Sequence, residues 1–224
     1  MTFSLVGRCE RTGMVGTAVS SSSPAVAARC AHARAGAGAA ASQNVTDPRL
    51  GPAVLDLMAE GRTAQQAVDA ALAKAQGAAH RQVTAVDEAG STGAFSGAYT
   101  LGTHAAAHGP GAVAAGNLLA SPDVPAAMVA AFAAEPEAHL GARLIAGLRV
   151  GLAAGGEEGP VRSAGVVVCD RVEWPVVDLR VDWDDDPIGR LAEAWAIWEP
   201  QIGDYVTRAL DPGSSPSFGV AGDE

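Results

Sequence analysis

TFSLVGRCERTGMVGTAVS, residues 2–20, is the stretch of sequence that decides the fold. In residues 3–8 large apolar side chains alternate with small or polar ones, which is typical of a β-strand with one buried face. Gly13 precedes a second apolar run, residues 14–20, and a glycine supplies the positive φ that short hairpin loops need. The segment therefore predicts an antiparallel β-hairpin.

Outside the hairpin, the chain alternates between strand-like blocks and pairs of helices. Further strands are expected at residues 37–43, 82–86, 92–96, 112–117, 164–169 and 177–183. Helices are expected at residues 51–60, 63–74, 121–134, 140–154 and from Pro187 toward Leu210. Because strands follow strands and the helices between them come in pairs, this order disfavours a parallel βαβ sheet. We predict an α+β fold, a four-layer αββα sandwich of two antiparallel sheets in residues 1–210, followed by a mobile tail in residues 211–224.

The composition bounds the class of protein. The chain has 224 residues, 48% of them hydrophobic, which suits one domain with a substantial core. Its formal net charge of −10 argues against nucleic acid or anionic membrane as a partner, because both select clustered Lys and Arg. No apolar run reaches membrane-spanning length. The three cysteines, Cys9, Cys30 and Cys169, are odd in number and far apart, so we expect buried thiols in a reducing cytoplasm.

Three motifs suggest a cofactor or a metal, and each has a simpler explanation. Residues 36–41, GAGAAA, match the glycine pattern of a dinucleotide-binding turn, but Pro48 would interrupt the helix that this motif needs. His104 and His108 have zinc-ligand spacing, although the glycines around them predict a loop with surface histidines. The acidic run at residues 182–186 fits the solvated start of a helix. We therefore expect no cofactor and no metal; NAD binding by residues 36–41 would contradict this.

Polar residues end several predicted strands and would meet at one edge of the sandwich: Thr2, Ser20, Gln43, Asn117 and Arg162. Asn117 is the best candidate for an oxyanion donor, because a neutral amide can stabilise developing negative charge. Arg162 and Arg180 are candidates for binding a substrate carboxylate through two hydrogen bonds. For Arg180 we expect an exposed ion pair with Asp178, Asp182 or a nearby acid, because its side chain faces away from the side that Leu179 and Val181 bury.

Thr2 has the most distinctive chemistry of these candidates. A single methionine precedes it, and an initiator methionine is usually removed before a side chain as small as threonine. Removal would free an α-amino group with a reference pKa of about 7.7–8.0. Part of that amine is neutral near pH 7, so one residue supplies both the hydroxyl nucleophile and its base.

The sequence also resembles the DUF1028 family, bacterial proteins with an Ntn-hydrolase-like (N-terminal nucleophile) fold. The resemblance rests on ten segments, residues 2–8, 12–13, 15–20, 33–39, 42–43, 48–52, 81–83, 116–120, 162–164 and 178–182. It implies the αββα sandwich that the strand order suggests independently. It also implies a threonine, Thr2, in the position that N-terminal nucleophile hydrolases use.

The resulting hypothesis is a hydrolase of small amides. The hydroxyl of Thr2, freed of Met1, would attack the carbonyl of a small-molecule amide and so cleave its C–N bond. Asn117 and backbone N–H groups would hold the oxyanion, and the substrate would contact Ser20, Gln43, Arg162 and Arg180. The alternative is a non-catalytic protein that keeps the sandwich and binds a small ligand or serves as a scaffold. A protein that retains Met1 would favour this alternative. Both hypotheses are compatible with a homo-oligomer.

Overall fold

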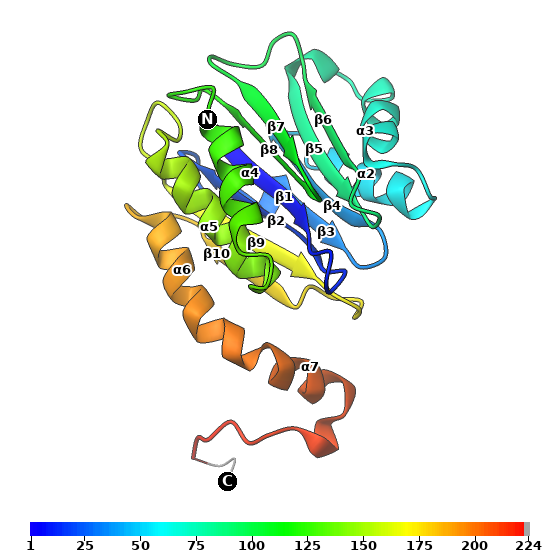
Figure 1. The fold of residues 1–224 in the computed structure, drawn as a ribbon, viewed down its shortest axis with the longest axis vertical. Helices are drawn as coiled ribbons and strands as arrows, with labels where there is room; N and C mark the ends of the chain where they lie inside the picture. The colour runs from blue at the N-terminus through cyan, green and yellow to red at the C-terminus, as the bar shows by residue number, and fades with distance from the viewer. Residues whose placement is uncertain (222–224) are drawn as a thin grey trace.

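The protein contains two antiparallel β-sheets stacked face to face, as a computed structural model of residues 1–221 shows (Figure 1). The strands are β1 Thr2–Arg8, β2 Val15–Ser21, β3 Ala31–Arg34, β4 Gly38–Asn44, β5 Arg81–Asp87, β6 Thr92–Ser96, β7 Ala105–Gly109, β8 Ala112–Asn117, β9 Ser163–Cys169 and β10 Val177–Val181. One sheet has six strands in the order β10-β9-β2-β1-β8-β7, and the other has four in the order β3-β4-β5-β6. The predicted hairpin is confirmed, because β1 pairs antiparallel with β2. The predicted burial of residues 164–169 is confirmed as well.

Helices cover the outer face of each sheet, so the predicted αββα order is confirmed. Helices α4 Val124–Ala134, α5 Leu140–Ala153 and α6 Pro187–Trp198 pack on the six-stranded sheet. Helices α2 Leu50–Ala59 and α3 Ala64–Ala73 pack on the four-stranded sheet, and a short helix, α1 Ala27–Cys30, follows β2. Thr63 and Gln66 form a capping box at the start of α3.

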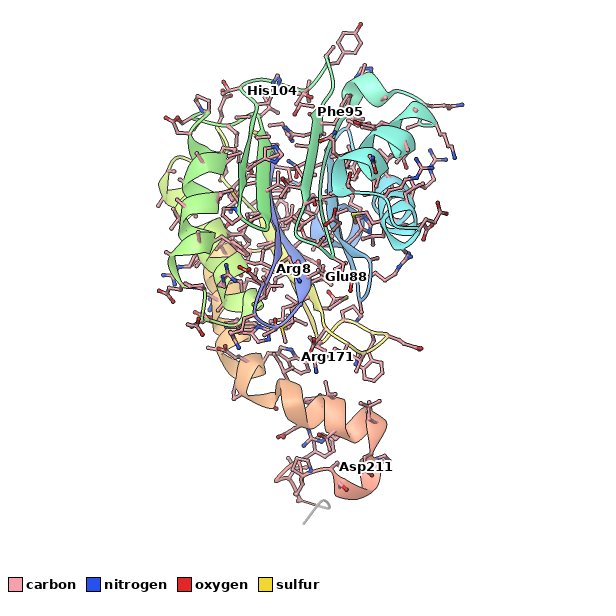
Figure 2. The ribbon with its side chains drawn as sticks, turned by 45° about the vertical axis from the view of Figure 1, so that its right-hand side comes forward. Arg8, Glu88, Phe95, His104, Arg171 and Asp211 are labelled. Atoms are coloured by element: carbon pink, nitrogen blue, oxygen red, sulfur yellow. The ribbon has the colours of Figure 1, made fainter. Side chains whose placement is uncertain are left out.

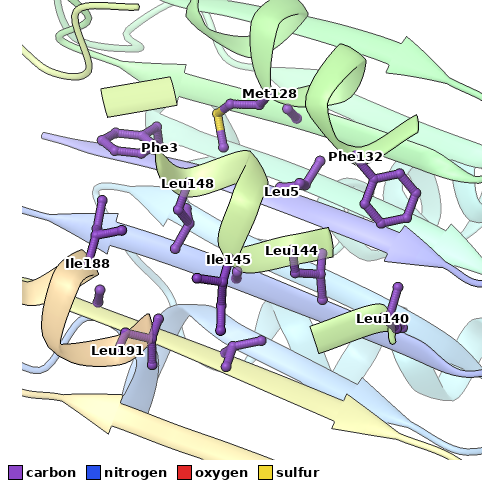
Figure 3. Close-up of a cluster of buried hydrophobic side chains, with 14 of the residues drawn as sticks. Phe3, Leu5, Met128, Phe132, Leu140, Leu144, Ile145, Leu148, Ile188 and Leu191 are labelled. Atoms are coloured by element: carbon purple, nitrogen blue, oxygen red, sulfur yellow. The ribbon is translucent and has the colours of Figure 1, made fainter. Parts of the chain in front are cut away.

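Alternation along β1 places successive side chains in two different layers. Phe3 and Leu5 point toward the helices and join a large apolar cluster with residues of α4 and α5 such as Met128 and Leu148 (Figure 3). Val6 faces the other sheet and packs in the layer between the two sheets. Thr2 and Ser4 are four and two residues before Val6, so their side chains point to the same face of β1 and belong to this inner layer.

The last predicted helix is divided in two. Helix α6 ends at Trp198, a 3₁₀ turn covers Glu199–Gln201, and α7 Ile202–Leu210 follows. Pro200 lies in this turn and has no N–H for an α-helical hydrogen bond, which explains the break. Helix α7 extends away from the sandwich, and none of its residues is buried (Figure 1). In the segment predicted as a mobile tail, the Phe218 ring stacks on Arg208; residues 222–224 lie outside the described residues.

Two strands, β3 and β7, were not expected from the sequence. Both are rich in alanine and lack the β-branched residues typical of strands, so pairing with β4 and β8 decides their conformation. Strand β4 begins at Gly38, inside the GAGAAA motif, and therefore replaces the helix that a dinucleotide-binding turn requires. His108 lies on β7 rather than in a loop, and its Nδ1 is 2.8 Å from Thr92 Oγ1.

Candidate functional site

Thr2 lies at the end of a central strand, between the two sheets. It pairs with Asn117 of β8, and the neighbouring pair Phe3–Ser20 places Ser21 beside it on β2. Its side chain is buried beneath Met1: Thr2 is 6% exposed, and its Oγ1 bonds to the Met1 carbonyl oxygen. Ser21 Oγ is 3.2 Å from the Thr2 hydroxyl and also bonds to that carbonyl. The hydroxyl groups of Thr2 and Ser21 thus both donate hydrogen bonds to the Met1 carbonyl oxygen.

A chain of hydroxyl groups leads from this point toward the surface. Ser21 Oγ is 2.8 Å from Ser23 Oγ, which accepts a hydrogen bond of 2.6 Å from Arg29 Nη2. Ser20, the serine predicted from the sequence, lies on the opposite face of β2 and donates to the Ser163 carbonyl at 3.0 Å. The structure therefore brings Ser21 rather than Ser20 to Thr2, because neighbouring residues of a strand point to opposite faces.

Three buried amides form a cluster beside Thr2, in which Asn117 of the same sheet meets Gln43 and Gln82 of the other sheet. Gln82 Oε1 accepts hydrogen bonds from Gln43 Nε2 at 2.8 Å and from Asn117 Nδ2 at 3.1 Å. Gln43 and Gln82 also donate to the β8 carbonyl groups of Ala115 and Gly116. An amide nitrogen carries two hydrogens, so Asn117 has a second N–H to donate. Its Oδ1 is buried and has no hydrogen-bond partner among residues 1–221.

Glu157 is the one carboxylate in this polar region that sequence reasoning missed. It precedes β9, forms a β-bridge with Leu119 and is only 4% exposed. Burial raises the pKa of Glu157 to about 7, while the Met1 ammonium and Ser22 act in the opposite direction. Neither carboxylate oxygen has a partner of standard hydrogen-bond geometry among the described residues. A buried carboxylate whose hydrogen-bonding capacity is so poorly met is uncommon.

The backbone near this site adopts an unusual conformation at three positions. Ala25, Asn44 and Leu118 have φ values of 50°, 75° and 50°, a region that glycine and to a lesser degree asparagine adopt, but alanine and leucine rarely do. Asn44 and Leu118 directly follow Gln43 and Asn117, and Ala25 ends the serine-rich turn. Such positions are retained where the surrounding structure requires them, and they cluster at functional sites.

The two predicted arginines lie differently with respect to Thr2. The Arg162 backbone N–H donates to the Ser21 carbonyl at 2.8 Å, and its side chain pairs with Asp185. Arg180 lies on β10, the strand at the edge of the sheet, and pairs with Asp178 through two hydrogen bonds of 2.7 and 2.9 Å. The predicted surface pair of Arg180 is therefore confirmed, and this side chain is not brought to Thr2.

Two open hollows lie at the far end of β1, around Thr12 and around Arg8, with volumes of about 670 and 700 Å³. Figure 2 shows Arg8 and Glu88 at this end and His104 at the other. Residues that line the hollows are mostly exposed loop residues, and Thr2 is not among them. We favour the Thr2 end as the functional site because buried polar groups without partners gather there.

Within residues 1–221, no three His, Cys, Asp or Glu side chains are grouped as metal ligands would be. The same residues contain no helix long and apolar enough to cross a membrane. What the arrangement offers is a threonine hydroxyl, a serine beside it, amide donors and an unpaired carboxylate. A nucleophile, hydrogen-bond donors and a titratable group therefore occur in one region of the molecule.

The protein is therefore an α+β protein, an αββα sandwich with a group of buried polar side chains at the start of its central strand β1. The chain belongs to DUF1028, a family of unknown function, whose family model matches residues 2–191. Its fold is similar to the crystal structure of protein SPO2555 from Silicibacter pomeroyi, which is described with the same family, with a TM-score of 0.83 and 29% sequence identity. That similarity covers 91% of this chain and 89% of the other. No curated protein matches the sequence significantly.

Proposed function

We propose that the protein is an N-terminal nucleophile hydrolase that cleaves a small amide through Thr2 after Met1 is removed. The observation that carries this proposal is the position of Thr2, at the start of an inner strand, with its hydroxyl beside Ser21 and its strand partner Asn117 on the same face. Side chains directly opposite each other in antiparallel strands lie about 4.5–5.5 Å apart at Cβ, so one carbonyl group can contact both.

In the proposed reaction the free α-amine of Thr2 takes the hydroxyl proton as Oγ1 attacks the carbonyl carbon. The second N–H of Asn117 stabilises the oxyanion, while Gln82 holds the amide in place through the first. The C–N bond then breaks, and the ammonium of Thr2 returns the proton to the leaving amine. A water molecule hydrolyses the ester on Thr2 and restores the free hydroxyl.

The neighbouring residues support this chemistry in separate ways. Ser21 can donate its hydroxyl to the substrate carbonyl, as it does to the Met1 carbonyl. Gln43 helps to fix Gln82, and the Arg162 backbone fixes the end of β2. We propose that the Arg162 side chain, 29% exposed, contacts the polar part of the substrate. Arg180 is on the edge strand β10 and Ser20 is on the face of β2 that points away from Thr2, so neither is our first choice for this role.

A cytoplasmic location is part of the proposal. It is supported by Cys9, Cys30 and Cys169, which are buried free thiols of the kind retained in reducing compartments. The net charge of −10 favours a small-molecule substrate over a nucleic acid.

The alternative, a sandwich that binds a ligand without catalysis, applies where Met1 is retained, because an amide nitrogen is not a base. The test is a panel of small amides assayed with a chain that starts at Thr2 and with a chain extended before Met1. We expect turnover by the first chain only. Equal turnover by both would overturn the free-amine mechanism, and ligand binding without turnover by either would favour the alternative.

A further inference from the structure

Glu157 is held rigidly next to the segment that follows Asn117. Besides the bridge between Glu157 and Leu119, the Glu158 N–H donates to the Leu118 carbonyl at 2.9 Å, and the Ala120 N–H donates to the Gly156 carbonyl at 3.1 Å. The Glu157 side chain is therefore buried by a fixed backbone rather than by a movable loop end. A charged carboxylate in such a place is costly without a partner, so a cation that enters offsets part of its desolvation through a charge-assisted hydrogen bond.

Met1 shows what kind of group fits between Glu157 and Thr2. Its carbonyl oxygen contacts the hydroxyl groups of Thr2 and Ser21. Its side chain lies over Gly159, where an added Cβ would be 3.3 Å from Met1 Cε and 3.7 Å from Met1 Sδ. Its ammonium is near enough to lower the pKa of Glu157, against the larger effect of burial. Met1 is thus an α-aminoacyl group held in the site by its carbonyl and its side chain, with its ammonium close enough to act on the charge of Glu157.

The position of Met1 is relevant to a substrate because of the chemistry of threonine. An acyl group on the nitrogen of a threonine and an acyl group on its Oγ interconvert through a small ring, so their carbonyl carbons occupy neighbouring positions. The ester that forms when Thr2 attacks a substrate therefore places the substrate acyl group close to the space that Met1 fills. Once Met1 has been removed, that space is free for the substrate.

We propose that the substrate is an amide of an α-amino acid with a free amino group, and that Glu157 binds its ammonium. This inference rests on the proposed function and names its substrate class. The Thr2 hydroxyl attacks the carbonyl next to the bound ammonium, and the substrate side chain lies over Gly159. The C–N bond breaks as the acyl group passes to the Thr2 hydroxyl and the amine leaves, and water then hydrolyses the ester on Thr2 to release the free amino acid. The absence of a side chain at residue 159 leaves room for an unbranched apolar side chain such as that of methionine.

Binding can be measured separately from catalysis in a chain that starts at residue 2 and carries Thr2→Ala. The probes are L-methioninamide and N-acetyl-L-methioninamide, which differ in the charge of the amino group. We expect calorimetry to show that L-methioninamide binds at least about tenfold more tightly than its acetylated form. Adding Glu157→Gln should reduce this preference to about twofold or less, because the neutral amide retains shape but not charge. The matched control is Glu158→Gln, an exposed neighbour that should leave the preference unchanged.

Three results would overturn the inference. These are equal binding of the two probes, binding of neither probe, and a preference that survives Glu157→Gln. If Glu157 instead serves the amine of residue 2, Glu157→Gln would weaken both probes equally, which also contradicts the proposed substrate class. None of these results bears on turnover of other amides by the Thr2 chain, so failure of the inference is distinguishable from failure of the proposed function.

Discussion

The two ends of strand β1 are built in different ways. At the Arg8 end the chain turns through Gly13, whose φ of 81° suits glycine, and the turn closes as the Cys9 N–H donates to the Met14 carbonyl and the Gly13 N–H donates to the Cys9 carbonyl. At the Thr2 end, buried polar atoms lack partners, and Leu118 adopts a positive φ that leucine rarely takes. At the hairpin end glycine occupies the position where the backbone needs a positive φ. At the Thr2 end, by contrast, a leucine has a positive φ and polar atoms are buried without partners. Departures of this kind are expected where a site rather than stability determines the residues.

The largest effect should come from the nucleophile itself. Thr2→Ala removes the hydroxyl and should lower kcat/KM for an amide substrate by at least about a thousandfold. Thr2→Ser keeps both hydroxyl and amine and should retain measurable activity. Thr12→Ala, in the turn at the other end of β1, is the matched control and should be as active as the wild type. Steady-state kinetics measure all three variants. An active Thr2→Ala variant would show that the Thr2 end of β1 is no more important for catalysis than the Thr12 end.

Asn117→Ala should have the next largest effect, because it removes the proposed oxyanion donor. We expect kcat to fall by about 100- to 1000-fold. Stability should fall by only about 1 kcal/mol, since Gln82 Oε1 keeps its hydrogen bond from Gln43. Kinetics and denaturant unfolding of the same variant separate the two effects. A loss of stability without a loss of kcat would assign Asn117 a purely structural role.

Adjacent residues of β1 should differ in their effect on folding. Leu5→Ala leaves a cavity beneath α5 and should lower the free energy of unfolding by about 2–5 kcal/mol. Ser4 is also fully buried, but its hydroxyl has no partner among residues 1–221, so Ser4→Ala should be neutral or stabilising. Urea unfolding measures both variants. A large destabilisation by Ser4→Ala would contradict the expectation that the inner face of β1 contributes less to stability than the face that packs on the helices.

The stability of the folded protein should depend on Glu157 between pH 4.5 and 7. Burial raises the pKa of this carboxyl from 4.5 to about 7, so the folded protein retains a proton that the unfolded chain releases in this range. The stabilisation is therefore complete below pH 4.5 and is lost as the pH rises toward 7. Unfolding free energies measured across this range should vary less with pH in Glu157→Gln, whereas Glu158→Gln should behave like the wild type. An unchanged slope in Glu157→Gln would contradict the raised pKa.

The smallest effect is expected at the edge strand. Arg180→Ala breaks an ion pair with Asp178 in which both side chains are about two-fifths exposed, so stability should change by about 0–1 kcal/mol. Amide turnover should be unchanged if Arg180 has no contact with the substrate. A rise in KM would instead assign it the carboxylate-binding role that the sequence suggested.

Much of the fold was predictable because its patterns are local. The alternation in residues 3–8, the glycine before the second strand and the capping box at Thr63 each depend on residues close in sequence. Strands β3 and β7 were missed because alanine and glycine have no strong preference, and their partners lie elsewhere in the chain. The break between α6 and α7 was also predictable, because Pro200 lacks the N–H that a continuous helix needs.

The site was predictable only where a residue ends a strand. Thr2, Gln43 and Asn117 were found in this way, and the structure brings them to one region. Ser21 was missed by one position, because the face of a strand depends on pairing register. Glu157 carries no local signal: it lies about 40 residues beyond Asn117, and only the fold shows that it is buried near Met1.

The central claim, that Thr2 acts through its own free amine, is tested most directly by the intact mass of the protein purified from its native host. No substrate is needed for this measurement, and N-terminal sequencing identifies the first residue. The account predicts a chain shorter by one methionine residue that begins at Thr2 with an unmodified amine. A native protein that retains Met1, or carries a blocked Thr2 amine, would contradict it.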